Sequence, residues 1–150
     1  MQSRKATSQD MRVVFTDLAQ RSVDEMHAAE YTLHDVKDVF RKLRKSGDLW
    51  SLVVDDEPIG LIGFRRDEHE GSPITASYFV GREAFFDPAV PSARFGRRFM
   101  REMQVQYGNL PLVSMCYGRH LEIERWYRIM GYRLAETLGV QRNFVLDPVS

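Results

Sequence analysis

The sequence predicts a mixed α/β fold of the α+β kind, in which roughly four helices flank a central, mostly antiparallel mixed sheet of about six to seven strands. Short β-branched or aromatic runs alternate with longer segments in which apolar residues recur at helical spacing. Two of the short runs, 50–54 and 59–64, flank a polar connection of hairpin length. With 150 residues, the chain is long enough for one hydrophobic core and too short for two ordinary domains.

The N-terminal part predicts a leader, one strand and helices. Residues 1–10 are polar without periodicity, so we expect a flexible leader followed by a single domain over 11–150. The run 11–15, MRVVF, predicts the first strand. Sparse apolar positions over 17–30 predict one broken helix or two short ones. The letters TLHD, from Thr32, resemble a capping box, and the apolar face that follows predicts a helix ending at Gly47.

The middle of the chain predicts three strands and a helix. Runs 50–54 and 59–64 are expected to pair antiparallel across the polar residues 55–58. The polar segment 65–73 separates them from a further strand over 74–80. The loop 81–94 has a length that is often associated with function. The next helix is predicted by aromatic and apolar residues at a constant helical spacing: Phe95, Phe99, Met103 and Tyr107.

The C-terminal part predicts a strand, a helix and a hairpin. The strand covers 112–116, the helix covers 121–130, and the hairpin has strands 132–138 and 143–146 around Gly139. No internal repeat or low-complexity tract interrupts the series. Helices are therefore interspersed with strands along the whole chain, as a layered architecture requires.

Composition excludes several classes of function. Lysine plus arginine equals aspartate plus glutamate, 21 each, so no overall field attracts nucleic acid or an anionic membrane. No segment approaches the roughly 20 apolar residues that span a bilayer. The single cysteine, Cys116, excludes an intrachain disulfide framework and favours a cytoplasmic setting. The four histidines and Cys116 show no metal-ligand spacing, so we expect no metal.

The stretch HLEIERWYRIMGY, residues 120–132, together with the order of elements, resembles the GNAT superfamily of acyl-CoA-dependent N-acetyltransferases. Members commonly carry Asn-x-x-Ala-x-x-x-Tyr-x-x-x-Gly-Phe/Tyr on their last helix and the following strand. Tyr127, Gly131 and Tyr132 match this pattern, whereas His120 and Ile123 depart from it. The resemblance extends over residues 11–146. Within the superfamily, the overall pattern of the sequence resembles that of small phage-encoded GNAT-like proteins.

The resemblance implies a catalytic role for Tyr127. In the family, a tyrosine at this position often lies beside the coenzyme A sulfur and protonates the departing thiolate. A phenol within hydrogen-bond reach can serve as such a general acid. The alternative is a core tyrosine whose hydroxyl is tied to the backbone. Gly131 is structural under both interpretations, because glycine ends a helix in the left-handed conformation at little cost.

The resemblance also implies a coenzyme site, with acetyl-CoA as cosubstrate. In the family, the pyrophosphate binds at a turn written Arg/Gln-x-x-Gly-x-Gly/Ala, and an exposed helix start favours such an anion. In the segment VPSARFGRRFM, Gly96 takes the place of the first glycine, which puts Ala93 and Arg98 at two altered positions. The alternative is a solvated basic helix start. The implied coenzyme contacts are Ser77, Tyr78, Phe79 and Val80 for the pantetheine arm, Arg94, Phe95, Gly96, Arg97 and Arg98 for the pyrophosphate, and His120.

Acetyl transfer to an amine also requires a route for the proton of the amine. Candidate groups occur in two segments, and each has an alternative role as a solvated surface residue. The candidates are Glu25, His27 and Glu30 in the first helical region and His69 and Glu70 in the segment before the strand at 74–80.

Two functions therefore follow from the sequence. The first is an acetyl-CoA-dependent N-acetyltransferase acting on an amine of a small molecule or a protein. The second is a catalytically inactive GNAT-like phage protein that binds a host factor or is associated with the virion. Retention of Tyr127 favours the first, and the altered phosphate turn around Gly96 favours the second.

Overall fold

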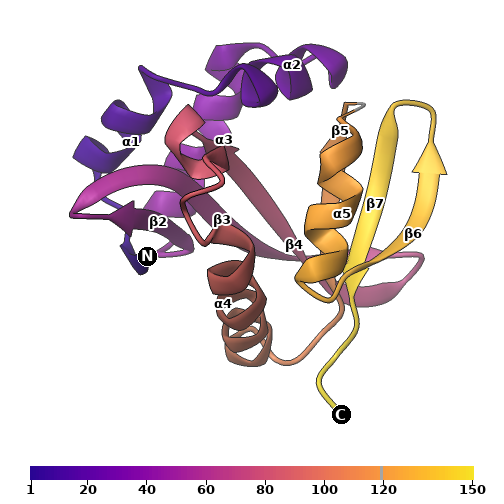
Figure 1. Cartoon of the computed structure of the whole chain (residues 1–150). Coiled ribbons are helices and arrows are strands. Elements are labelled where there is room, and N and C mark those ends of the chain that lie inside the picture. The colour runs from indigo at the N-terminus through magenta and orange to yellow at the C-terminus, as the bar shows by residue number, and fades with distance from the viewer. Residues whose placement is uncertain (119) are drawn as a thin grey trace. The chain divides into compact units, whose positions relative to one another are not determined.

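The computed structural model describes residues 1–118 and 120–150. The chain forms two compact units, residues Met1–Phe64 with Tyr78–Pro91 and residues Arg65–Ser77 with Ser92–Ser150, which are described separately. Among the described residues, seven strands are hydrogen-bonded in the order β1-β2-β3-β4-β5-β7-β6, and five α-helices accompany them (Figure 1). The predicted mixed, mostly antiparallel fold is confirmed, with one helix more than expected.

The elements follow one another with these bounds: β1 (Gln2–Lys5), α1 (Ser8–Phe15), α2 (Gln20–Ala28), α3 (Leu33–Lys45), β2 (Leu49–Val54), β3 (Glu57–His69), β4 (Ser72–Gly81), the short 3-10 helix η1 (Glu83–Phe86), α4 (Ser92–Gln106), β5 (Leu112–Tyr117), α5 (Leu121–Ile129), β6 (Arg133–Leu138) and β7 (Gln141–Leu146). None of the described helices combines the length and the apolar character that crossing a membrane requires.

The first ten residues are ordered, which corrects the expected flexible leader. β1 pairs antiparallel with β2, from Gln2 opposite Val53 to Lys5 opposite Trp50. The Lys5 ammonium also lies 4.0 Å from the centre of the Trp50 ring. β1 is the outer strand of the order, and polar side chains are common on edge strands because they face water. Polar composition therefore did not indicate disorder here.

Residues 11–15 belong to helix α1, so the predicted strand is wrong. Thr7 caps this helix: its hydroxyl accepts from the Asp10 amide at 3.1 Å, and the Asp10 carboxylate accepts from the Thr7 amide at 3.2 Å. Met11, Val14 and Phe15 are buried at helical spacing. The cap and this buried face outweigh the strand preference of the two adjacent valines.

The first unit has its core between its helices and strands. Phe15 of α1 meets Phe40 of α3 edge to face, with ring centres 5.5 Å apart. The predicted capping box at Thr32 is present. β2 and β3 pair antiparallel as predicted, although Asp55 and Asp56 alone make the turn, with φ of 50° and 65°. The buried cluster consists of Met11, Val14, Phe15, Phe40, Leu43, Leu49, Leu61 and Val80.

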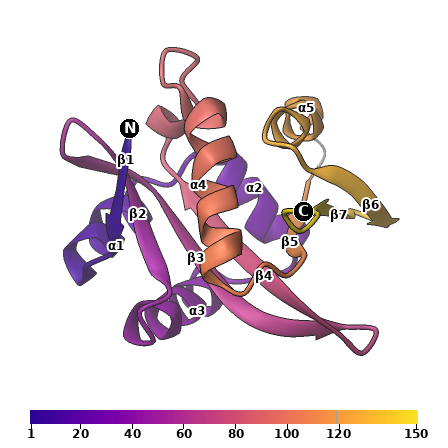
Figure 2. The same cartoon turned by 90° about the horizontal axis from the view of Figure 1, so that it is seen from below.

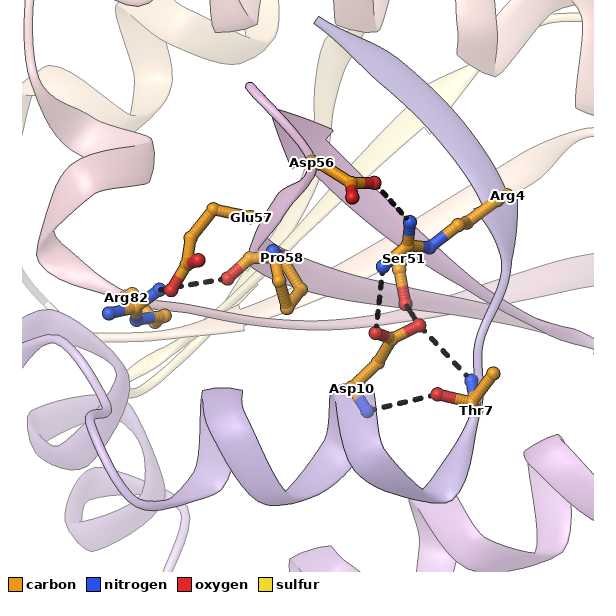
Figure 3. Close-up of polar contacts among 8 residues, drawn as sticks. All are labelled: Arg4, Thr7, Asp10, Ser51, Asp56, Glu57, Pro58 and Arg82. Atoms are coloured by element: carbon orange, nitrogen blue, oxygen red, sulfur yellow. Dashed lines mark hydrogen bonds and ion pairs between the residues drawn. The ribbon is translucent and has the colours of Figure 1, made fainter.

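A buried carboxylate links three elements of the first unit (Figure 3). Asp10 is 4% exposed and accepts from Arg4 Nη2 at 3.0 Å and from the Ser51 hydroxyl at 2.8 Å. Arg4 also bonds Asp56 at 2.9 Å. Burial raises the pKa of Asp10, but the hydrogen bonds from Arg4, Ser51 and Thr7 outweigh it, so the net pKa lies below its usual value.

A second polar contact in the same unit holds the end of β4. Arg82 donates to Asp17 at 2.9 Å, to Glu57 at 3.1 Å and to the Pro58 carbonyl at 3.0 Å. Figure 3 shows Arg82 reaching Glu57 and Pro58 from the segment after β4. The guanidinium thus joins the start of β3 to the chain after α1.

The second unit contains the C-terminal strands. β4 and β5 are parallel, and their ladder joins Thr75–Ser77 to Leu112–Ser114. β7 pairs antiparallel with both β5 and β6, and Figure 2 shows β6 beyond β7. The predicted polar connection 65–73 is instead strand, since β3 continues to His69 and β4 begins at Ser72. The turn between them uses Glu70 and Gly71 with positive φ.

Candidate active site

The end of helix α5 explains the spacing of Tyr127, Gly131 and Tyr132. The Tyr132 amide donates to the Tyr127 carbonyl at 3.0 Å, and the Gly131 amide donates to the Arg128 carbonyl at 2.9 Å. Gly131 has a φ of 97°. These two bonds and the left-handed glycine are the Schellman motif, in which the residue after the glycine contacts the one five positions earlier. The match to the family pattern therefore has a local structural cause.

Aromatic rings surround Tyr127 within the second unit. Its ring stacks on Phe144 of β7, with centres 4.4 Å apart and planes 10° apart. Tyr132 meets it edge to face at 5.1 Å and 71°, and Trp126 does so at 5.3 Å and 78°. Phe144 has no exposed surface, whereas Tyr127 is only half-buried. Tyr127 is thus packed at its ring while keeping partial access to solvent, and its catalytic role stays a prediction.

Tyr132 is unsuited to proton donation. It is 4% exposed, and burial raises its pKa well above the usual value, although Ser114 and Arg101 act in the opposite direction. Among the described residues, its hydroxyl has no hydrogen-bond partner of ordinary geometry. Ser114 instead lies 2.5 Å, oxygen to oxygen, from the hydroxyl of Ser77. Of the two tyrosines of the motif, Tyr127 is the one able to meet a ligand.

Gly131→Ala is expected to lower the free energy of unfolding by about 1–2 kcal/mol, because an L side chain resists the left-handed conformation. A Cβ at this position would meet Leu146 at 3.5 Å, an ordinary contact, so conformation rather than crowding sets the loss. Gly131→Asn is the matched control and should lose less, because asparagine visits this conformation more readily. Urea denaturation of both variants is the measurement. Equal losses for the two would contradict this explanation.

The start of helix α4 is basic. Arg94, Arg97 and Arg98 lie in its first two turns, the first turn contains no acidic residue, and all three are exposed. Within the described residues, Arg94 and Arg98 have no hydrogen-bond or ion-pair partner, while Arg97 reaches the Ile129 carbonyl at 3.5 Å. The first four amides of a helix lack intrahelical acceptors, and the helix dipole is positive there. The amides of residues 92–95 and the guanidinium groups of Arg94 and Arg98 therefore form a surface that favours the binding of an anion.

Gly96 has a packing role. It lies in the second turn of α4, and a Cβ there would come within 2.6 Å of the Met130 sulfur. Met130 is 2% exposed and follows α5 directly. This glycine therefore allows α4 and the end of α5 to approach within the second unit. Its presence has an explanation without a phosphate, and its contact with coenzyme stays a prediction.

The predicted pantetheine residues offer backbone rather than side chains. Phe79 packs against Phe85 and Phe86, with ring centres 4.6 Å and 6.3 Å apart, and Val80 is 4% exposed. Tyr78 packs on the buried cluster of the first unit. The β4–β5 ladder ends at Ser77, whereas β4 continues to Gly81. The backbone after Ser77 makes no further ladder with β5 among the described residues.

The remaining predicted coenzyme contacts are Phe95 on α4 and His120 at the start of α5. Phe95 stacks on Phe99 of the same helix, with ring centres 5.6 Å apart. His120 stands at the start of α5 without a capping hydrogen bond from its side chain, and its carbonyl accepts from Arg142 at 3.4 Å. The contact of His120 with coenzyme stays a prediction.

The candidate base residues are divided between the two units. Glu25 and His27 lie on α2, and Glu30 follows it with a φ of 61°. In the second unit, His69 Nε2 lies 3.2 Å from Glu136 Oε1. Glu70 lies near both, so that one potential metal-ligand atom from each of the three side chains is within 4.8 Å of the other two. These side chains are partly or largely exposed, as surface acidic groups commonly are. Sequence spacing had not indicated the group, because Glu136 arrives from β6.

Solved structures share this fold. No protein-family model matches the sequence, and no curated protein sequence matches it. A GNAT-family acetyltransferase from Bacillus anthracis aligns with 95% of this chain and 92% of its own, at 13% identity and a TM-score of 0.68. Ribosomal-protein-alanine N-acetyltransferase from Brucella melitensis aligns with 99% of this chain and 100% of its own, at 9% identity and a TM-score of 0.69. PaiA N-acetyltransferase from Thermoplasma acidophilum, in complex with coenzyme A, aligns with 99% of this chain and 98% of its own, at 12% identity and a TM-score of 0.62. The chain has the GNAT fold.

Proposed function

We propose that this protein is an acetyl-CoA-dependent N-acetyltransferase. The observation that carries the proposal is the start of α4, where Arg94 and Arg98 are exposed without partners among the described residues. Unpaired guanidinium groups beside free helix amides suit a pyrophosphate. One neighbour of the same fold is a coenzyme A complex, which supports this ligand class.

The proposed reaction assigns distinct work to two parts of the second unit. The amides of residues 92–95, with Arg94 and Arg98, hold the pyrophosphate. The acceptor amine attacks the thioester carbon, so a C–N bond forms and the C–S bond breaks. Tyr127 gives its proton to the departing sulfur and regains one released by the amine.

The proposed acceptor is a primary amine of a small molecule or a protein, and the proposed setting is cytoplasmic. Neighbours of this fold include a ribosomal-protein-alanine N-acetyltransferase, a structure described as a putative phosphinothricin N-acetyltransferase, and a NatC complex bound to a Gag peptide and CoA. These neighbours suggest a screening panel of a peptide with N-terminal alanine, the Gag peptide and phosphinothricin, to which a lysine peptide is added as a test of a side-chain amine. Thiol release from acetyl-CoA, with mass spectrometry of the acceptor, tests the proposal. Acetylated product is expected, and its absence with every acceptor would count against catalysis.

The second candidate is a GNAT-like protein that binds a partner without catalysis, as a phage-encoded host-factor or virion protein would. Two observations favour it. Packing against Met130 accounts for Gly96, and helix capping accounts for the Tyr127–Gly131–Tyr132 pattern. The candidates differ in one measurable property, because only the acetyltransferase has to bind acetyl-CoA.

Replacing Arg94 and Arg98 together by alanine is expected to weaken coenzyme A binding about 10- to 100-fold, because two charge-assisted contacts to phosphate are lost. Arg97 is left in place because it contacts the Ile129 carbonyl. Lys42→Ala plus Lys45→Ala removes the same charge from the exposed end of α3 and is the control. Calorimetric titration compares the variants. Equal affinity of both double variants for coenzyme A would contradict the placement of the pyrophosphate at the start of α4.

A further inference from the structure

Two buried rings restrain Tyr127, and we propose that Phe144 and Tyr132 are positioning residues for its proton transfer. The inference rests on the proposed function, in which Tyr127 protonates the departing sulfur. Neither ring has to touch coenzyme or acceptor for this role. Phe144 was not singled out by the sequence, and Tyr132 was expected only to match a family pattern.

The first restraint is the stack on Phe144. Phe144 lies in β7, where it faces Ser114 of β5 and Leu134 of β6, so ladders hold its backbone on both sides. Its side chain has no exposed surface. With ring centres 4.4 Å apart and planes inclined by only 10°, Phe144 covers one face of the Tyr127 ring. Because Phe144 has no room to move, it fixes the plane in which the phenol lies.

The second restraint comes from the helix end. The Tyr132 amide bonds the Tyr127 carbonyl at 3.0 Å, so the two backbones are joined directly. The Tyr132 ring then meets the Tyr127 ring edge to face, at 5.1 Å and 71°. An edge contact nearly perpendicular to the stack limits sideways motion that the stack alone would permit. Together the two contacts confine the ring in two directions.

This confinement matters for a general acid. A phenol donates a proton only within hydrogen-bond reach of its acceptor, about 2.6–3.2 Å between heavy atoms. A displacement of about 1 Å can cost on the order of a hundredfold in rate, even when the mutated residue is remote from the reacting atoms. Loss of either ring should thus lower kcat while leaving the affinity for acetyl-CoA nearly unchanged.

The kinetic test uses Phe144→Leu and Tyr132→Leu. Each is expected to lower kcat about tenfold or more, with the KM for acetyl-CoA within about twofold of wild type. Tyr132→Phe keeps the ring and should restore the rate. Phe40→Leu makes the same change in a buried aromatic pair of the first unit and controls for lost packing. Adding Tyr127→Phe to Phe144→Leu should cost much less than Tyr127→Phe alone, because both act through one group.

A second readout does not depend on turnover. In protein carrying isotope-labelled tyrosine, the Tyr127 ring protons should be shifted by the Phe144 ring and should return toward ordinary positions in Phe144→Leu. Wild-type protein without acetyl transfer would overturn the proposed function and the positioning role with it, whether or not this shift is seen. Wild-type turnover with unchanged kcat in Phe144→Leu and Tyr132→Leu would overturn the positioning inference alone.

Discussion

Tyr127→Phe is expected to lower kcat about a hundredfold or more, within the 10²–10⁴ range of general acid catalysis, while the KM for acetyl-CoA changes little. The substitution removes only the hydroxyl. The ring keeps its stack on Phe144, so the fold and the coenzyme contacts should survive. The measurement is steady-state thiol release with an acceptor that supports turnover, accompanied by thermal unfolding to verify the fold.

Tyr107→Phe is the control for Tyr127→Phe. Tyr107 is also half-buried and belongs to the second unit, where its carbonyl accepts from Arg66 at 3.4 Å. Its hydroxyl has no assigned part in the reaction, so kcat should remain near that of wild type. If Tyr127→Phe retained kcat within about threefold of wild type, the tyrosine would be a packing residue and the departing thiolate would obtain its proton elsewhere.

Asp10→Ala is expected to lower the free energy of unfolding by about 3 kcal/mol, the largest stability effect foreseen for a single change. The variant loses the hydrogen bond from the Thr7 amide to the Asp10 carboxylate, one half of the capping box, which contributes about 1 kcal/mol. It also leaves the fully buried Ser51 hydroxyl without this acceptor, a loss of about 1–3 kcal/mol. The Arg4 guanidinium is 43% exposed and can return to water, which limits the cost.

Asp35→Ala provides a matched comparison. Asp35 occupies the same third position of a threonine-capped helix in α3, but it is exposed. Its loss should cost only about 1 kcal/mol, because it removes just the corresponding bond from the Thr32 amide. Chemical denaturation of both variants isolates the buried contacts of Asp10. Losses of equal size would show that the bonds to Arg4 and Ser51 add nothing to the cap.

The contribution of Asp10 should depend on pH. Its pKa is lower in the folded protein than in the unfolded chain, so folding favours the ionised form. The stabilisation is therefore fully present above the unfolded value of about 4 and is lost as pH falls through the folded pKa. The stability difference between wild type and Asp10→Ala should be constant from neutral pH to about pH 5 and shrink at lower pH. A difference that grew on acidification would contradict this assignment.

Helices with a local signature were predictable from the sequence, and α1 shows where local signals conflict. The sequence predicted α3 from the capping box at Thr32 and from Gly47 at its end, and the structure contains both features. In α1, adjacent valines favour a strand, but the cap formed by Thr7 and Asp10 and the burial of Val14 decide for a helix. The pairing of β1 with β2 was not foreseeable, because a polar edge strand resembles a disordered leader.

The candidate site was predictable only where it depends on local sequence. The spacing from Tyr127 to Gly131 follows from helix capping, which a sequence pattern can register. The Phe144 stack depends on the register of β7 and on how α5 packs over it, and no local pattern encodes either. Gly96 was singled out by its place in the family's phosphate turn, and the structure gives it a packing role as well, because a Cβ there would meet Met130.

Titration of the purified wild-type protein with coenzyme A and acetyl-CoA, followed by calorimetry, tests the proposed function most directly, because binding does not require a known acceptor. The proposal predicts saturable binding at micromolar strength, on the order of 8 kcal/mol, that weakens when Arg94 and Arg98 are replaced by alanine. Absence of binding at millimolar coenzyme would contradict it and leave a GNAT-shaped binding protein in place of an enzyme.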